Sequence, residues 1–258
     1  MKLLEGVRVA CFDLFDTLIH VRTDRYPEIE LNGTPLRSTI PIWHERVLAH
    51  HDVSLNELKE ALLAVWPQIR SELERDRGSE DERYKEMRAV EKYRRALTQL
   101  DRFSDEESES IALEIAIVHH ECLVNASFPA IRAGDVLEAV KSKDIETVLI
   151  SNWDYAPAAE AMLEATGLAP LLDHLVISEA VGLRKPHRRL FELALERCDT
   201  TAARALHVGD LARPDAWGAG RLGFRTVWID KNEDGWPADL EYAPTLTVTK
   251  LAELLDHL

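Results

Sequence analysis

The side chains best suited to chemistry fall in four separate segments of the sequence. The first segment contains Asp13, the second Ser151, the third Lys185 and the fourth Asp210. A carboxylate can attack phosphorus and so divide one difficult displacement into two easier steps. Because a carboxylate and a phosphate repel each other, this chemistry needs a hard cation between them, and Mg²⁺ suits oxygen ligands. A lysine can neutralise the charge that develops in phosphoryl transfer.

Taken singly, each of these segments has an ordinary structural explanation. An aspartate after a strand often forms a turn, and Ser151 with Asn152 could form an Asx-turn. Lys185 precedes Pro186, and a lone loop lysine is usually solvated. Asp215 could cap the helix that follows it, since a proline precedes it. The case for a functional site therefore depends on whether the fold brings the four segments together.

Apolar, β-branched stretches precede these segments and are typical of buried parallel strands. They are residues 7–14, 146–151, 174–178, 204–208 and 225–229. Helices are predicted between and after them, at residues 135–143, 156–166, 188–197, 215–222 and 250–258. This alternation predicts a Rossmann-like parallel sheet with helices on both faces. Ligands of such sheets bind beyond the carboxyl ends of the strands, so the side chains that follow the strands should converge there.

The stretch from residue 19 to residue 127 lacks this alternation. It begins with an irregular polar segment that contains Pro27, Gly33 and Pro35. Patterns of long amphipathic helices follow, at residues 40–51, 55–75, 81–100 and 106–124. We therefore predict an α/β core formed by residues 1–18 and 128–258. An all-helical domain, residues 19–127, is inserted after the first strand.

Together, the four segments resemble the four motifs of the haloacid dehalogenase-like (HAD) hydrolase superfamily. The matching segments are FDLFDTL at 12–18, SN at 151–152, LRKP at 183–186, and HVGD at 207–210 with Asp215 and a Gly-Ala helix after it. The stretch between the first and second motifs resembles the helical cap of the superfamily. The resemblance covers nearly the whole chain and points to a phosphatase-type member.

The resemblance implies a role for each matching residue. Asp13 occupies the position of the nucleophile, and catalysis would rest on it with Lys185 and Ser151. The residues implied to bind phosphate are Ser151, Asn152, Lys185 and Thr17. The implied Mg²⁺ ligands are Asp13, the backbone carbonyl of Phe15, and Asp210, with Asp215 supporting the ion through water or from the outer shell.

The sequence departs from the phosphatase pattern at position 15. Most phosphatases of the superfamily have a second aspartate there, which protonates the leaving oxygen and then deprotonates the attacking water; this chain has Phe15. General acid–base catalysis typically contributes about 10²- to 10⁴-fold, so hydrolysis of ordinary alkyl phosphates should be slow. Asp16 or a residue of the inserted domain could substitute, or the substrate could have a good leaving group, such as an acyl phosphate. For Asp16 itself, a turn-forming role is the favoured interpretation.

Three functions follow from this pattern. The leading hypothesis is a Mg²⁺-dependent phosphohydrolase that acts on a small phosphorylated metabolite through an aspartyl-phosphate intermediate. The alternative is a catalytically attenuated phospholigand-binding or regulatory protein that keeps the phosphate and metal site. The third choice is a 2-haloacid dehalogenase-like hydrolase, because dehalogenases of the superfamily also lack the second aspartate. They are metal-free, however, and Asp210 with Asp215 is a metal-binding pattern.

Composition limits the partners and the location. A net charge of −15 argues against nucleic acid as the main partner. No run of 18 apolar residues predicts a membrane span. The N-terminal residues do not resemble a signal peptide, and the three cysteines form no disulfide framework, so we expect a cytoplasmic protein. We expect a monomer or a homodimer.

Overall fold

The computed structural model describes residues 3–74 and 78–258. The chain divides into two compact units. The first unit contains the chain up to His20 together with Ser127–Leu258, and the second contains Val21–Ala126.

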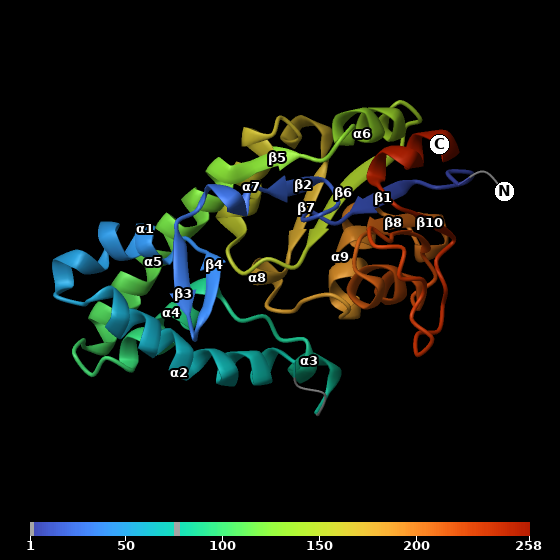
Figure 1. The fold of residues 1–258 in the computed structure, drawn as a ribbon. Coiled ribbons are helices and arrows are strands. Elements are labelled where there is room, and N and C mark those ends of the chain that lie inside the picture. Colours follow the sequence, from blue (N-terminus) through green and yellow to red (C-terminus); the bar gives the residue numbers. More distant parts are fainter. Residues whose placement is uncertain (1–2, 75–77) are drawn as a thin grey trace. The chain divides into compact units, whose positions relative to one another are not determined.

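A six-stranded parallel sheet forms the centre of the first unit, with the strand order β10-β9-β8-β1-β6-β7 (Figure 1). Its strands are β1 (Val9–Phe12), β6 (Glu146–Ser151), β7 (His174–Ile177), β8 (Ala205–Gly209), β9 (Arg225–Ile229) and β10 (Leu246–Val248). Strand β1 lies between β6 and β8, and Cys11 pairs with Val148 on one side and His207 on the other. All four residues of β1 are buried, as expected for a central parallel strand.

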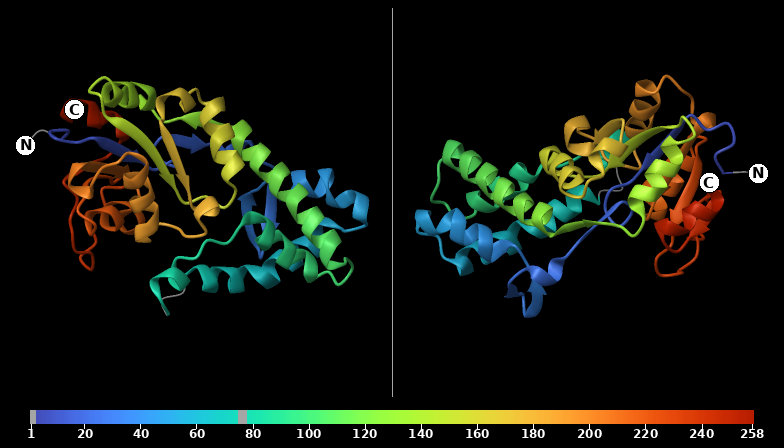
Figure 2. Two further views of the ribbon diagram at one scale, coloured as in Figure 1. Left: turned by 180° about the vertical axis from the view of Figure 1, so that it is seen from behind. Right: turned by 90° about the horizontal axis from the view of Figure 1, so that it is seen from above.

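Helices cover both faces of this sheet, which confirms the predicted fold class. They are α6 (Ala133–Lys141), α7 (Ala156–Ala165), α8 (Ser178–Val181), α9 (Arg188–Arg197) and α10 (Gly218–Gly220), with a π-helical turn at Ala212–Trp217 and 3-10 helices at Ala169–Leu171, Ala202–Arg204 and Leu251–His257. On one face, Phe191 of α9 packs in one buried cluster with Cys11 and Val148. On the other face, α6 lies beside the final 3-10 helix (Figures 1 and 2).

Two short strands stand where the chain leaves the first unit and where it returns. Strand β2 (Ile19–Val21) pairs with β5 (Ser127–Pro129). Close to this pair, the backbone N–H of Ala130 donates to the carbonyl of Leu18 at 2.8 Å. This contact ties the segment after the first strand to the chain that re-enters the core.

Helices make up most of the second unit. They are α1 (Ile40–Arg46), α2 (Leu55–Leu73), α3 (Glu80–Arg83), α4 (Ala89–Thr98) and α5 (Asp105–Ala126), with 3-10 helices at Thr23–Arg25 and Leu48–His51. Helix α4 packs against α2 and α5. The predicted helix at 81–100 is divided between α3 and α4, and the predicted helix end at residue 75 lies outside the described residues.

The second unit is not all-helical, which corrects one part of the prediction. Strand β3 (Glu28–Leu31) pairs antiparallel with β4 (Thr34–Arg37) in a hairpin. Asn32 and Gly33 at its tip have φ angles of 51° and 74°, and type I′ turns require such positive values. The sequence did not reveal these strands because they are largely exposed and Pro35 interrupts β4, so no alternation of apolar and polar residues marks them.

None of the helices in the described parts of the chain combines the length and the apolar character that a bilayer-spanning segment needs.

Candidate active site

Three carboxylates meet at the carboxyl ends of β1 and β8. Asp13 follows β1 directly, Asp210 follows β8 directly, and Asp215 lies in the π-helical turn that comes next. One oxygen of each carboxylate lies within 4.8 Å of the others. The backbone N–H of Asp13 donates to the carbonyl of Val208 at 2.9 Å, so the pairing of the two strands continues into the site.

Lys185 links two of these carboxylates. Its Nζ lies 2.6 Å from Oδ1 of Asp13 and 2.6 Å from Oδ1 of Asp215. The same ammonium donates to the carbonyl of Ile150 at 2.7 Å, and the residue is only 3% exposed. Burial works to lower the pKa of Lys185, but the two carboxylates outweigh it and raise the pKa above its ordinary value. The lysine therefore stays a cation inside the site.

Both oxygens of Asp215 have partners within the protein. Oδ1 contacts Lys185 and lies 3.2 Å from Nε2 of His207, while Oδ2 accepts from the backbone N–H of Leu211 at 3.0 Å. Burial works to raise the pKa of Asp215, but Lys185 and His207 lower it to about 2. Asp215 is thus a permanent anion that positions its neighbours.

Asp13 and Asp210 each keep one carboxylate oxygen without a hydrogen-bond partner among the described residues. Oδ2 of Asp13 and Oδ1 of Asp210 have no such contact, whereas Oδ2 of Asp210 lies 3.0 Å from Nζ of Lys231. Burial raises the pKa of Asp13 to about 7, against the opposing effect of Lys185, and burial also raises the pKa of Asp210. These two oxygens are available to a ligand or a cation.

Gly209 makes room for this arrangement. A Cβ atom added at Gly209 would lie 2.4 Å from Cγ of Asp215, which is far below ordinary contact distance. The glycine before Asp210 therefore lets the buried Asp215 carboxylate lie against the backbone of β8.

Two buried hydroxyls near the ends of β1 and β6 in the sequence have no hydrogen-bond partner within the described parts of the chain. They belong to Thr17, in the loop after β1, and to Ser151, at the end of β6, and both residues are 0% exposed. An unsatisfied buried polar group costs about 1–3 kcal/mol, so such groups usually meet a ligand or water. The two hydroxyls fit the prediction that Thr17 and Ser151 bind phosphoryl oxygens.

The side chain of Asn152 makes two hydrogen bonds with the backbone of Lys185. Its Nδ2 donates to the carbonyl of Lys185 at 3.0 Å, and its Oδ1 accepts from the N–H of Lys185 at 2.6 Å. This pair of hydrogen bonds holds the lysine loop against the end of β6. The predicted contact between Asn152 and a phosphate stays a prediction.

Position 15 carries an aromatic contact where phosphatases of the family carry an acid. The ring of Phe15 lies 4.3 Å from the ring of Trp153, centroid to centroid, at an interplanar angle of 38°. The backbone carbonyl of Phe15 accepts no hydrogen bond from the residues that the structure describes, and its predicted role as a metal ligand stays a prediction.

Asp16 is held by two neighbours. It has a φ of 56°, its Oδ1 lies 3.1 Å from Nδ1 of His20, and its Oδ2 lies 3.0 Å from Nζ of Lys231. Burial works to raise the pKa of Asp16, but the hydrogen bonds from His20 and Lys231 outweigh it and lower the pKa. A carboxylate that stays ionised is a poor general acid.

Two further residues shape the site, and the sequence pattern did not single them out. Lys231 bridges Asp16 and Asp210, and buried His207 contacts Asp215. Lys231 comes shortly after predicted strand 225–229, so the rule that strand ends converge could have found it. His207 lies within a strand, and only the packing around Asp215 reveals its contact.

The site contains oxygen donors suited to a hard divalent cation. One carboxylate oxygen each of Asp13 and Asp210 and the carbonyl of Phe15 are free. The side chains of the group Asp13, Asp210 and Asp215 offer only oxygen ligands. The ammonium groups of Lys185 and Lys231 contact four carboxylates, those of Asp13, Asp215, Asp16 and Asp210, so the carboxylates outnumber the ammonium groups by two. A cation is therefore compatible with both the chemistry and the charge of this site.

Residues 7–223 match the haloacid dehalogenase-like hydrolase family. The match covers most of the chain, and the chain belongs to this family.

Sequence relatives within the family carry several names. A pyrimidine 5'-nucleotidase of Escherichia coli, YjjG, is 34% identical over 52% of this chain and 60% of its own length. A phosphoserine phosphatase of Thermus thermophilus is 38% identical over 36% of each chain, and the (S)-2-haloacid dehalogenase 4A of Burkholderia cepacia is 32% identical over 47% of this chain and 52% of its own. The chain thus spans at most 60% of the length of these relatives.

Solved structures share the fold over nearly the whole chain. A 2-haloacid dehalogenase from Pseudomonas syringae pv. Tomato DC3000 has a TM-score of 0.68 at 21% identity, with 97% of both chains covered. A HAD phosphatase from Thermococcus onnurineus has a TM-score of 0.61 at 19% identity, also with 97% of both chains covered. At such identities the likeness concerns the fold and leaves the reaction open.

Proposed function

We propose that this chain is a Mg²⁺-dependent phosphohydrolase that acts on a small phosphorylated metabolite through an aspartyl-phosphate intermediate. The observation that carries the proposal is the carboxylate of Asp13: one of its oxygens contacts Lys185, the other accepts no hydrogen bond from the described residues, and the carboxylate lies within 4.8 Å of that of Asp210. The unpartnered hydroxyls of Thr17 and Ser151 supply donors for a phosphoryl group. Relatives named phosphoserine phosphatase and glyceraldehyde 3-phosphate phosphatase support this class of substrate.

The oxygen donors of the site suit Mg²⁺. Asp13, the carbonyl of Phe15 and Asp210 would hold the ion, and Asp215 would support it through water or from the outer shell. When bound, the ion would reduce the repulsion between the Asp13 carboxylate and the phosphate. A fold relative from Bacillus subtilis, the putative HAD-hydrolase YfnB, is described as bound to magnesium, which supports this choice of metal.

The residues of the chain divide the work of the reaction. Oδ2 of Asp13 would attack phosphorus and form the acyl phosphate, while the bond from phosphorus to the leaving oxygen breaks. Thr17 and Ser151 would donate to the phosphoryl oxygens, and Lys185 would neutralise their charge. Water would then attack phosphorus, release inorganic phosphate and restore the carboxylate of Asp13.

The leaving oxygen receives no proton from position 15. Phe15 has no titratable group. Burial works to raise the pKa of Asp16, but the hydrogen bonds from His20 and Lys231 outweigh it and lower the pKa, so this carboxylate stays ionised. We therefore infer a substrate whose leaving group departs readily without protonation, such as an acyl phosphate.

We further propose that Val21–Ala126 acts as a cap that excludes water during the reaction.

A hydrolysis assay tests the proposal. A panel of acyl and alkyl phosphates is incubated with the protein, with and without Mg²⁺, and released phosphate is measured. We expect Mg²⁺-dependent turnover that is fastest for acyl phosphates and that Asp13→Asn abolishes, while the exposed-residue control Asp256→Asn keeps it. Turnover that survives Asp13→Asn, or that needs no metal, would contradict the proposal.

The attenuated phospholigand-binding protein is the second candidate, and the contact between Phe15 and Trp153 favours it. The aromatic pair fills the position of the missing acid, so the site could bind a phosphorylated ligand with little turnover. Binding without hydrolysis, measured by calorimetry on the same phosphate panel, would support this candidate. Release of halide from 2-haloacids without metal would instead indicate the dehalogenase reaction. The carboxylate pair of Asp13 and Asp210, which suits a metal ion, argues against that reaction.

We also propose a cytoplasmic protein that acts as a monomer or homodimer on small molecules rather than on nucleic acid. All three cysteines are free thiols, which suits a reducing compartment. Cell fractionation and light scattering test these two points.

A further inference from the structure

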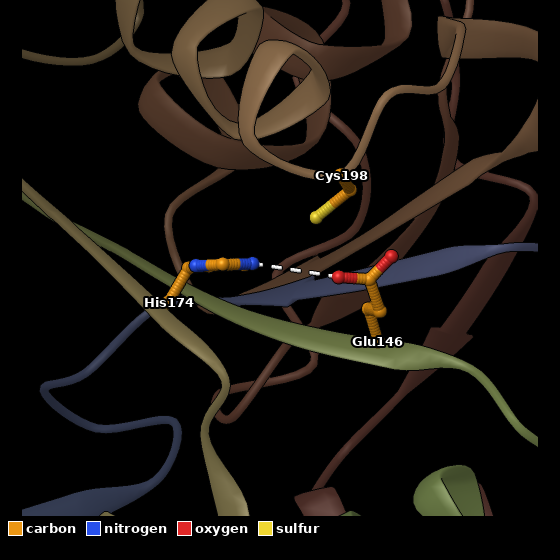
Figure 3. A group of neighbouring side chains, drawn as sticks. All are labelled: Glu146, His174 and Cys198. Atoms are coloured by element: carbon orange, nitrogen blue, oxygen red, sulfur yellow. Dashed lines mark ion pairs between the residues drawn. The ribbon is translucent and has the colours of Figure 1, made fainter.

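A second group of side chains that could bind a metal ion lies where strands β6 and β7 begin (Figure 3). It consists of Glu146, the first residue of β6, His174, the first residue of β7, and Cys198, which ends α9. The carboxylates of the candidate active site follow the carboxyl ends of strands, whereas this group marks the amino ends. The two groups share no residue.

Strand register brings two of the three residues together. His174 pairs with Val148, so Glu146, two residues earlier on β6, projects from the same face of the sheet as His174. Helix α9 covers this face, because Phe191 packs in one cluster with Val148. A helix that connects parallel strands runs against them, so its last turn places Cys198 over their amino ends.

The distances fit a shared ion. Nε2 of His174 lies 3.4 Å from Oε2 of Glu146, and the ligand atoms of all three residues lie within 4.8 Å of one another. Two ligands bound at about 2.0–2.1 Å to a tetrahedral ion are about 3.4 Å apart, which matches the separation of His174 and Glu146. The side chains of His174 and Glu146 are 32% and 47% exposed, so an ion and a water molecule as fourth ligand can reach them.

The donor types select the class of metal. One sulfur, one imidazole nitrogen and one carboxylate oxygen suit a borderline-soft ion such as Zn²⁺ and do not suit Mg²⁺. We propose that Glu146, His174 and Cys198 form a binding site for a Zn²⁺-class transition metal that ties β6, β7 and α9 together. The site would join these elements at the amino ends of the strands, with water as the fourth ligand of the ion.

Metal binding at the cluster involves the thiol of Cys198 and leaves out the neighbouring carboxylate of Asp173. A cysteine binds a metal ion as its thiolate, so an ion bound at Cys198 would displace the thiol proton. Asp173, which precedes His174 in the chain, contacts Lys141 and Thr147. It therefore leaves the fourth position to water.

Cobalt substitution tests the proposal on the full chain, because Co²⁺ reports its ligands by absorption. Co²⁺ is added in the presence of excess Mg²⁺, which occupies oxygen-only sites. We expect a thiolate-to-cobalt charge-transfer band together with visible bands of tetrahedral coordination, saturating at one equivalent and removed by Zn²⁺. Absence of a sulfur band would overturn the proposal.

Variants assign the band to the cluster. Cys198→Ser and His174→Gln should each remove the band or weaken Co²⁺ binding by about tenfold or more, while Cys122→Ser should leave it unchanged. Cys122 is the matched control because it is another partly buried thiol, located in α5. A band that survives Cys198→Ser, or that Cys122→Ser removes, would place the metal elsewhere and overturn the proposal.

Thermal unfolding gives a readout that does not depend on cobalt. Zn²⁺ should raise the unfolding midpoint of the wild-type chain and of Cys122→Ser but not that of His174→Gln. Equal Zn²⁺ shifts in the wild type and in His174→Gln would contradict the proposal. The metal-free midpoints of the same variants show whether each one folds.

Discussion

The ammonium of Lys185 lies 2.6 Å from Oδ1 of Asp13, although the two residues are 172 positions apart in the chain. The contact joins the end of β1 to the loop after α8, and Asn152 holds that loop through both backbone groups of Lys185. The same lysine also contacts Asp215. One cation thus holds two buried carboxylates in place and favours their charged forms.

Replacing Lys185 with methionine should damage both stability and activity. The change leaves the carboxylates of Asp13 and Asp215 buried without their cation, and breaking a buried ion pair costs about 3–5 kcal/mol. Urea unfolding should show this loss, and phosphatase activity should fall by about 10²-fold or more. The exposed Lys143→Met serves as control and should keep both. Wild-type stability of Lys185→Met would show that the contact carries little free energy.

Phe15→Asp should restore the missing general acid and base. Turnover of alkyl phosphates should rise by about 10²-fold or more, because an acid at this position can protonate the leaving oxygen. Phe15→Leu, which removes the ring contact with Trp153 without adding an acid, is the matched control and should bring no such gain. Initial rates on an alkyl phosphate measure both. An equal gain in the two variants would attribute the effect to lost stacking rather than to proton transfer.

Gly209→Ala should displace the buried carboxylate of Asp215. The new Cβ would lie 2.4 Å from its Cγ, and forcing extra volume into a packed region costs about 1–3 kcal/mol. Activity and the free energy of unfolding should both fall. Gly134→Ala is the opposite case: Gly134 lies in α6 with its nearest neighbour at 4.0 Å, so alanine should stabilise the helix by about 0.5–1 kcal/mol. Equal effects of the two substitutions would contradict this account.

Removal of divalent metal should abolish activity, and Mg²⁺ should restore it. Asp210→Asn removes one anionic ligand and should raise the Mg²⁺ concentration for half-maximal activity by about tenfold or more. Asp256→Asn, which changes an exposed carboxylate, should leave that concentration unchanged. Full activity in the presence of a chelator would refute the proposed use of metal.

Asn152→Ala should separate a positioning role from a phosphate contact. Loss of both hydrogen bonds to the Lys185 backbone should lower kcat and cost about 1–3 kcal/mol of unfolding free energy. If Asn152 instead binds the phosphate directly, KM should rise with little change in stability. Steady-state kinetics and urea unfolding of the same variant distinguish the two roles.

The amino-acid sequence by itself determined five of the six core strands, all but β10, and the residues that follow them. Buried parallel strands are nearly continuous apolar runs, so residues 146–151 and 225–229 were predicted with the bounds that the structure has. The substitution at Phe15 is likewise visible without any coordinates. Local pattern suffices here because burial of a strand constrains every residue along it.

Only the tertiary structure decided which partners these residues meet. The bridge from Lys231 to Asp16 and Asp210 and the hold of Asn152 on Lys185 depend on loops that approach from distant parts of the chain. Exposed elements were missed for the opposite reason. The β3–β4 hairpin buries little, so its sequence carries no period, and its pairing depends on the turn at Asn32 and Gly33. Periodicity records burial, whereas contacts between side chains depend on long-range packing that no local pattern contains.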